Sequence, residues 1–525
     1  MLANFGKYSG FILRRERVVS LIWLAACVSA FVGLAAYFPG LMPDEATLNA
    51  MAVMLDTPAM TAMMGKVYGA EVFSQAIAMS VDCLSWYLIT VAIMNIFLVN
   101  RHTRTDEELG RQEMLIALPV GRLTGGAAAL AFAVVLNALI AALTAVGLIA
   151  LNIGGTTVAG ALAFGGAIGA VGFVFAGLTL LFAQLFSAAR GVTGASMAAL
   201  GLFYVLRASG DVSGNALSYI SPLGLALKTE AFYSNRLSPI VILLVEGAAL
   251  SAIALTLNAV RDHGVGIIPA RKGKAHASRF LQGPFGLAWR LTRTTALWWT
   301  VGLLVIGVMY GSVVVDIEDF AADNAMVSAM LEAAGNGSMT EQYVAMLFSI
   351  MSMIATVPVA LTVMRLRSEE AHGRLEQIIG RSVKRSSLFV GFIVIAFAMS
   401  LAALFVTALG MLALSGGAIG AAAVMKAAFA YLPAMWLIVG LISLLIGAAP
   451  KLTPLIWVLF GYSFVAVYFG KVIELPDWMA KLSPFGHIPQ LPVQEFALAP
   501  LAVLTGIAIA LSAFGLWRYR ARDIY

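Results

Sequence analysis

Long apolar stretches, separated by short polar segments, run through the whole chain. Twelve of them approach or exceed the roughly 20 residues that a helix needs to cross a bilayer. The pattern predicts an all-α polytopic membrane protein with twelve transmembrane helices, because only helices and closed barrels satisfy their own backbone groups in lipid. The stretches cover residues 18–38, 76–99, 123–150, 161–186, 192–207, 238–260, 296–315, 342–364, 387–415, 420–447, 453–469 and 496–517.

The polar segment between the second and third stretches occurs twice. Residues 104–122 read RTDEELGRQEMLIALPVGR and residues 367–385 read RSEEAHGRLEQIIGRSVKR, aligned without a gap at an offset of 263. An internal repeat of this kind indicates two copies of one structural module. Eight of the nineteen positions are identical, namely Arg104/Arg367, Glu107/Glu370, Gly110/Gly373, Arg111/Arg374, Glu113/Glu376, Ile116/Ile379, Val120/Val383 and Arg122/Arg385.

Shorter matches in the same order support the repeat. Arg14, Arg17 and Trp23 correspond to Arg290, Arg293 and Trp299; Ser-Pro-x-Gly at 221–224 corresponds to 483–486, and Arg-Asp at 261–262 to 522–523. We therefore predict two six-span modules, 1–262 and 263–525, joined by a polar connector at 261–295. Six is an even number, so the modules form parallel repeats about an axis along the membrane normal.

The charge distribution predicts the orientation. The chain is 61% hydrophobic and only 11% charged, with a mean hydropathy of +0.92, against about 25% charged residues in soluble domains. If the N-terminus is inside, 26 of the 33 Lys and Arg residues lie in inner segments. The positive-inside rule then predicts a multi-pass protein of the plasma membrane with both termini cytoplasmic. Membrane flanks account for the net charge of +6 and exclude a nucleic acid as partner.

No segment carries the chemistry of an enzyme. The sequence has no phosphate-binding GxxxxGK[ST] loop, HExxH, paired CxxC or GxSxG motif. Its polar segments are too short for a nucleotide-binding domain, and its two cysteines, Cys27 and Cys83, lie in predicted spans. We expect no cofactor, metal or catalytic residue on this chain. Any work driven by ATP must come from a separate subunit.

The repeated segment is the first candidate site. The positive-inside rule explains its basic residues but not its acidic ones, which favours a surface for a partner protein over a plain solvated loop. Glu107 and Glu370, at identical places, are predicted to pair with basic groups of that partner. Replacing both with Arg would then leave membrane insertion intact. The candidate residues are Arg104, Asp106, Glu107, Glu108, Gly110, Arg111 and Glu113, followed by Arg367, Glu369, Glu370, Gly373, Arg374 and Glu376.

Two acids inside spans form the second candidate site. Asp82 and Glu246 would each cost about 2.5–3.5 kcal/mol at the bilayer centre, so such residues usually face a cavity or a partner. Contact with a substrate and hydrogen bonding between helices both remain open. Their counterparts are Ala345 and Ala508, which argues against a symmetric proton relay.

The R-x-[DE]-E-x-x-G-R-x-E segment, six spans per module, S-P-x-G and the closing Arg-Asp resemble the permease subunits of type-2 ABC exporters. The fused double form is similar to the tetronasin-type exporters of polyketide antibiotics. The resemblance implies that residues 104–118 and 367–381 are coupling helices for two copies of an ATPase, which would bind ATP and Mg²⁺. It also implies a central cleft for hydrophobic or amphipathic small molecules such as drugs. Ala371 and Ser382 replace Glu108 and Pro119, so the two ATPase contacts are expected to be unequal.

Two alternatives fit less well. A secondary transporter of the major facilitator type, driven by an ion gradient, also has two parallel six-span halves, but its loop between spans two and three is usually short and basic. A membrane regulator of cell-wall hydrolases would need a sizeable external domain, and the longest external loop, 39–75, is too short to supply one.

The topology can be tested with single cysteines in a variant that lacks Cys27 and Cys83. We expect a membrane-impermeant maleimide, added to intact cells, to label Phe320→Cys, which lies between the first two spans of the second half. Ala275→Cys in the connector should label only after the cells are opened. Labelling of position 275 from outside would contradict the predicted orientation.

Overall fold

The computed structural model describes residues 2–42, 44–116, 119–268, 276–314, 338–380, 383–469 and 476–522. Positions 275, 320 and 382, named above, lie outside these residues. Within them all regular structure is helical, and twelve helical segments are long and apolar enough to cross a membrane. Each overlaps one predicted stretch, which confirms the all-α polytopic class. The spans are Phe5–Gly40, Gln75–Glu108, Thr124–Leu151, Val158–Leu185, Ala189–Ser213, Ser238–Val260, Pro284–Gly311, Met339–Ala371, Arg385–Leu414, Ala421–Ala448, Pro450–Val467 and Leu498–Ala521.

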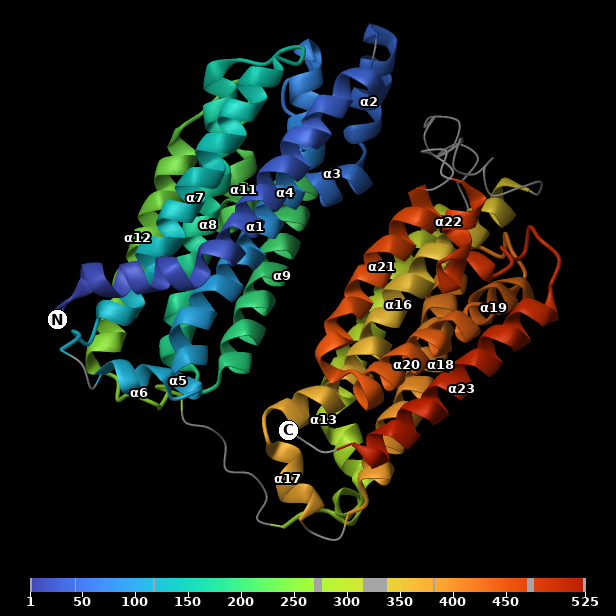
Figure 1. Ribbon diagram of the computed structural model, residues 1–525. Coiled ribbons are helices and arrows are strands. Elements are labelled where there is room, and N and C mark those ends of the chain that lie inside the picture. The colour runs from blue at the N-terminus through green and yellow to red at the C-terminus, as the bar shows by residue number, and fades with distance from the viewer. Residues whose placement is uncertain are drawn as a thin grey trace. The chain divides into compact units, whose positions relative to one another are not determined.

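The chain divides into two compact units, Met1–Gly273 and Lys274–Tyr525, with six candidate spans in each (Figure 1). The spans of unit 1 are α1 (Phe5–Leu41), α4 (Gln75–Asn100), α7 (Thr124–Leu151), α8 (Val158–Leu185), α9 (Ala189–Ser213) and α12 (Ser238–Val260). Its shorter helices are α2 (Glu45–Leu55), α3 (Pro58–Met64), α5 (Asp106–Glu108), α6 (Arg111–Ile116), α10 (Leu217–Ile220) and α11 (Pro222–Leu227).

The described spans of unit 2 follow in the same order as those of unit 1, and the fourth is divided into two helices. Its fourth span is α19 (Ala421–Phe429) followed by α20 (Leu432–Ala448), where Pro433 begins the second helix. Pro lacks the N–H that a helix interior needs, but is tolerated in the first turn. The other spans are α13 (Pro284–Val313), α16 (Met339–Ala371), α18 (Arg385–Leu414), α21 (Ile456–Phe464, flanked by short 3₁₀ and π turns) and α23 (Leu498–Ala521); the short helices include α17 (Arg374–Ile379) and α22 (Asp477–Lys481).

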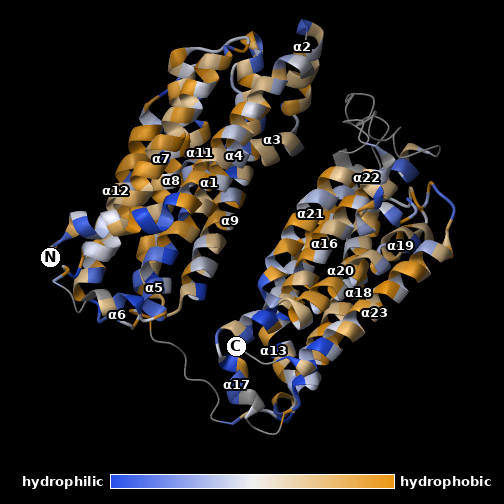
Figure 2. Cartoon of the chain, in the orientation of Figure 1, coloured by the Kyte–Doolittle hydropathy of each residue, from blue (hydrophilic) through white to orange (hydrophobic). Residues whose placement is uncertain are grey.

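The second and fourth spans form the centre of each unit. Buried residues make up 61% and 72% of the apolar windows of α4 and α8, and 72% and 67% of those of α16 and the α19–α20 span, against 17–22% for α1, α9 and α12. The peripheral helices expose large apolar side chains such as Val241, Val245 and Trp298. Figure 2 shows apolar residues along the spans and polar ones gathered towards their ends. An apolar perimeter of this extent is a surface for lipid.

The repeated Ser-Pro-x-Gly forms a tight pair of short helices in both units. Ser221 caps α11, with Pro222 in its first turn, and the Ser221 hydroxyl donates to the Phe203 carbonyl at 2.7 Å. Ser483 and Pro484 begin a 3₁₀ turn after α22 in the same way. A Cβ at Gly224 or Gly486 would overlap the carbonyl oxygen of Ser218 or Ala480, respectively. Glycine is therefore required where the two short helices meet.

Substitution at this glycine should destabilise the fold. We expect Gly224→Ala to lower the free energy of unfolding by about 1–3 kcal/mol, since the added methyl group forces the backbone apart. Gly201→Ala is the matched control, because a Cβ at Gly201 in α9 meets no atom within 4 Å. Thermal unfolding of the purified variants in detergent would measure both. A Gly224→Ala protein that melts with the wild type would contradict this account.

Candidate functional site

Glycine in a left-handed conformation ends the second span of each unit. After α4 the chain continues through a π turn, Arg101–Thr105, and α5, and then turns at Gly110 with φ +68°. In unit 2 α16 reaches Ala371 and turns at Gly373 with φ +66°. Residues with a Cβ rarely adopt this conformation. The repeated glycine therefore directs both chains from the span into a short helix, α6 or α17.

Glu107 is the centre of a buried ion cluster beside this turn. Its two carboxylate oxygens accept from the two terminal nitrogens of Arg261, at 2.9 and 3.0 Å, and Arg104 lies 3.0 Å away on the other side. The Gly264 amide also donates to it. The side chains of Arg104, Glu107 and Arg261 are only 1%, 7% and 6% exposed. A bidentate Arg–carboxylate pair of this kind is among the strongest polar contacts in proteins.

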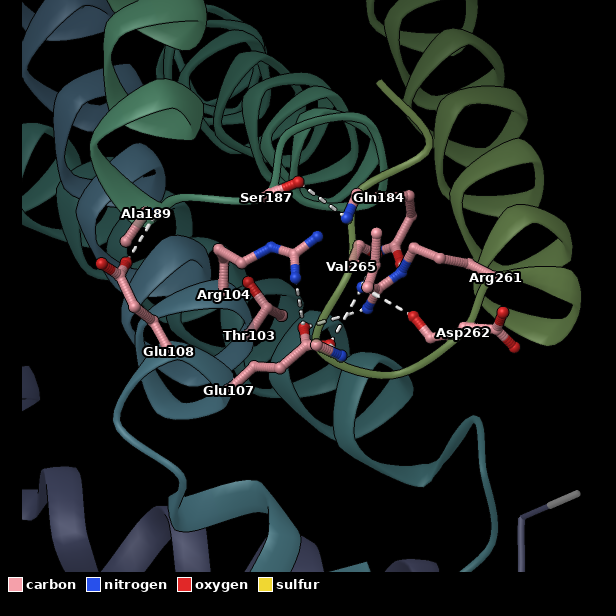
Figure 3. A network of polar contacts seen from close by, with 12 residues as sticks. Thr103, Arg104, Glu107, Glu108, Gln184, Ser187, Ala189, Arg261, Asp262 and Val265 are labelled. Atoms are coloured by element: carbon pink, nitrogen blue, oxygen red, sulfur yellow. Dashed lines mark hydrogen bonds and ion pairs between the residues drawn. The ribbon is translucent and has the colours of Figure 1, made fainter. Parts of the chain in front are cut away.

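The same cluster fixes the segment that leaves α12 (Figure 3). Arg261 donates to the Gln184 side chain at 3.0 Å and to the Val265 carbonyl at 2.7 Å. Farther along, Gly266 donates to the Ser187 hydroxyl at 2.9 Å. The turn after α4, the end of α8 and the end of α12 are therefore held together by one set of contacts.

Glu108 binds a fourth helix. Its carboxylate accepts from the backbone N–H of Ala189 at 2.9 Å, at the N-terminus of α9. A carboxylate there satisfies a free donor and is stabilised by the helix dipole. Ala371 occupies this place in unit 2 and cannot form the contact, so the two copies differ in this internal contact. The expected inequality of the two ATPase contacts stays a prediction.

Unit 2 repeats the central cluster. Glu370 contacts Arg522 at 2.6 Å, and Arg367 lies farther away, at 3.8 Å. Arg385 donates to the Arg522 carbonyl at 3.0 Å. Its repeat partner, Arg122, likewise donates to the carbonyl of Arg261. Four residues that correspond between the modules therefore form the same contacts at the end of the sixth span in each unit.

A second ion pair in each unit joins a buried acid to a half-exposed arginine. Asp106 contacts Arg111 at 3.1 Å, and Glu369 contacts Arg374, also at 3.1 Å. In unit 1 Asp106 binds Arg15 of α1 as well, at 2.7 Å. The corresponding additional partner in unit 2 is Arg365 of α16 itself, 2.6 Å from Glu369.

These contacts change the interpretation of the predicted residues. Glu107 and Glu370 are buried in internal pairs, so the expectation that they face basic groups of a partner is corrected. A segment beside the membrane has a reason to be acidic, because Arg261 and Arg522 require counter-charges. In the sequence both arginines are markers of the repeat, and the local pattern did not assign them to the site. The repeated Arg-Asp pair at 261–262 and 522–523 was the signal in the sequence that could have identified them as site residues.

The remaining candidate residues are of two kinds: exposed residues of the repeated segment, and the two acids within spans. Glu113 and Glu376 are exposed, and Arg111 and Arg374 are half exposed. Asp82 in α4 and Glu246 in α12 are each partly buried. Asp82 has the Cys83 thiol 3.9 Å away, and no ion pair joins either acid to another described residue. The structure does not bring them together, and their role in a cavity stays a prediction.

Known proteins identify the class. The chain is 34% identical over 522 residues to the multidrug efflux system permease protein Rv1217c of Mycobacterium tuberculosis, with 98% of this chain and 94% of that protein covered. The chain belongs to this family of efflux permeases. Residues 281–520 also match the family described as multidrug efflux system permease Rv1217c, C-terminal domain. The permease is thus a transporter subunit and not an enzyme.

The buried cluster predicts a specific loss of stability in the permease. Glu107→Gln keeps the shape of the side chain but leaves Arg104 and Arg261 without a counter-charge, which costs about 3–5 kcal/mol when a buried pair is broken. Glu113→Gln is the control, since exposed changes alter stability by about 0.5 kcal/mol or less. Thermal unfolding of the permease in detergent measures both. By the same reasoning Glu107→Arg with Glu370→Arg should impair folding rather than spare insertion. If Glu107→Gln melts at the same temperature as the wild type, the ion cluster does not stabilise the permease as described.

Proposed function

We propose that this permease forms the membrane-spanning part of an ATP-driven ABC-type drug exporter, in which one chain supplies both six-span halves. The observation that carries the proposal is the full-length similarity to an efflux permease. The family membership removes the alternative of a secondary transporter. ATP and Mg²⁺ would be bound by separate ATPase subunits, one for each copy of the repeated segment.

The surface available to an ATPase is the exposed face of the turn and the short helix after it. In unit 1 this face carries Leu109 and Met114, which are 48% and 69% exposed, beside Arg111 and Glu113. Exposed apolar residues among charges are typical of an interface. In unit 2 the equivalent positions hold His372, Arg374, Glu376 and Gln377. The first surface is therefore more apolar than the second, and we expect its ATPase contact to be the tighter one.

The ion clusters supply a route from this surface to the spans. The turn is the direct continuation of α4, and its Glu107 and Glu108 bind the end of α12 and the start of α9. In unit 2 Glu370 binds the end of α23. A force on α6 or α17 would therefore move several helix ends together, since packed elements shift as discrete units rather than deform continuously. ATP-driven closure of the ATPases would act on the spans through these contacts.

This function requires the side with the ion clusters to be cytoplasmic. The predicted excess of Lys and Arg on that side supports the orientation. For the cargo we propose hydrophobic or amphipathic small molecules, including drugs, in line with the name of the relative. The resemblance to polyketide-antibiotic exporters adds polyketides as a narrower class within it.

The docking surface can be separated from the buried clusters by charge reversal. We expect Glu113→Lys with Glu376→Lys to leave expression and melting unchanged, because both side chains are exposed. Loss of a partnered interfacial charge costs about 2–5 kcal/mol, so the ATPase should no longer co-purify and drug resistance should fall to that of cells without the permease. The control is Glu495→Lys, an exposed acid in the outer segment before α23. If the ATPase still co-purifies with the double variant, this surface is not where the ATPase docks.

A further inference from the structure

A polar cavity lies in unit 1 at the end opposite to the ion clusters. Its volume is about 350 Å³, which is within the range of small-molecule sites. It is enclosed by the segment after α3, the end of α9, the short helices α10 and α11, and the start of α12. The charged residues in its lining are Lys66, Asp211, Lys228, Glu230 and Arg236.

The two acids of the cavity already have partners. Asp211 accepts from the Ser218 hydroxyl at 2.6 Å and lies 3.8 Å from Arg207. Arg207 is fully buried and also donates to the carbonyls of Ala62 and Met63, at 3.0 Å each. Glu230 pairs with Arg236 at 3.4 Å. The carboxylates are thus neutralised from within the unit.

Arg207 and Arg236 are paired with carboxylates, but within the described part of the chain the two lysines of the cavity are not. Neither Lys66 nor Lys228 has a carboxylate within ion-pair distance among the described residues, and the Lys228 ammonium lies 4.1 Å from the centre of the Tyr219 ring. Tyr68 also lines the cavity, and its phenol is a neutral hydrogen-bond donor at pH 7, as an ordinary tyrosine is. Burial, with Asp211 and Glu230 nearby, raises its pKa further, to about 12. The cavity therefore offers two positive charges and a neutral donor to a ligand.

One wall of the cavity is apolar and reaches the perimeter of the unit. Leu225, Pro239 and Ile242 line it, and Ile242 is exposed, as are Val241 and Val245 on the same helix. A ligand with a polar head in the cavity could extend an apolar tail along the outward face of α12. The arrangement suits an amphiphile better than a wholly polar solute.

Three of the charged lining residues have no charged counterpart in the second half of the sequence. At the offset of 262 given by Ser221 and Ser483, Lys228 corresponds to Gln490, Glu230 to Pro492 and Arg236 to Leu498. The short helices that line the site are repeated, but these three charged residues are not. Packing of the shared fold therefore does not account for these residues.

We propose that this cavity binds the anionic head of an amphiphile, with a phosphate or similar group between Lys66 and Lys228 and the apolar tail along α12. In the proposed orientation the cavity lies on the outer side, where the head could belong to a phospholipid of the outer leaflet or to a free anionic amphiphile. Binding requires no ATPase, so the proposal can fail or stand independently of the proposed function.

The test uses the full permease without ATPase, purified in a neutral detergent, and native mass spectrometry to count bound ligand. The probes are phosphatidylglycerol, phosphatidylcholine and dodecyl phosphate. Each basic residue near a lipid surface contributes about a five-fold gain in affinity for an anionic head. Lys66→Gln with Lys228→Gln should therefore weaken phosphatidylglycerol binding about 25-fold and leave phosphatidylcholine binding unchanged.

Two further variants make the result specific. Lys66→Arg with Lys228→Arg should retain binding, and Lys426→Gln with Lys481→Gln in unit 2 should have no effect. A response of dodecyl phosphate alone would assign the site to free amphiphiles, and a response of phosphatidylglycerol would assign it to lipid. If neither phosphatidylglycerol nor dodecyl phosphate binds the Gln variant more weakly than the wild type, the proposal is overturned. Melting of each variant checks that the fold is intact.

Discussion

The pairing of a buried glutamate with the arginine that ends the sixth span holds each unit together at one end. Isolated charges are too costly to bury, so Glu107 and Arg261, and likewise Glu370 and Arg522, must remain in contact if the surrounding helices keep their places. Each pair joins residues that are 154 and 152 positions apart in the chain. It thereby fixes the end of the sixth span beside the turn that follows the second span. The second and fourth spans are the most buried spans of each unit.

The spans could be predicted because bilayer solvation imposes a strong constraint on every residue within them. The repeat gave the number of modules, and it also contained the residues of the ion clusters. Their roles could not be predicted, because an acid that pairs with a partner protein and one that pairs with a distant arginine of its own chain have the same local sequence. Position on the turn decides between them. Glu107 points towards the bundle, whereas Glu113, six residues later and beyond the glycine turn, is exposed.

The two units share a fold but differ in how firmly the turn is attached. In unit 1 Arg15 of α1 binds Asp106, and fully buried Glu16 contacts Arg101 at 3.3 Å. Thr292 of α13 replaces Glu16, and its hydroxyl donates to the carbonyls of Ala288 and Trp289 in its own helix. A similar difference lies deeper in the spans. Asn95 and Asn137 exchange two hydrogen bonds between α4 and α7, at 2.9 and 3.0 Å. The matching positions in unit 2 are Pro358 and Ser400, and the Ser400 hydroxyl accepts a hydrogen bond from the Trp436 indole at 3.0 Å.

These differences bear on what a segment of mixed charge must do at a membrane surface. Basic residues alone would satisfy the orientation rule. An all-basic turn, however, would repel Arg261 and Arg522, the arginines that end the sixth spans. The inward acids solve this problem and leave the outward face, with Arg111 and Glu113 or Arg374 and Glu376, free to vary in its apolar neighbours. The inward ion pairs are nearly the same in both units, whereas the apolar neighbours of the outward charges are not. The proposed transmission to the spans and the proposed recognition of a partner would therefore be separable properties of the same short segment. The unit whose turn also binds α1 and α9 has the more apolar outward face, so the firmer attachment coincides with the surface better suited to a lasting contact.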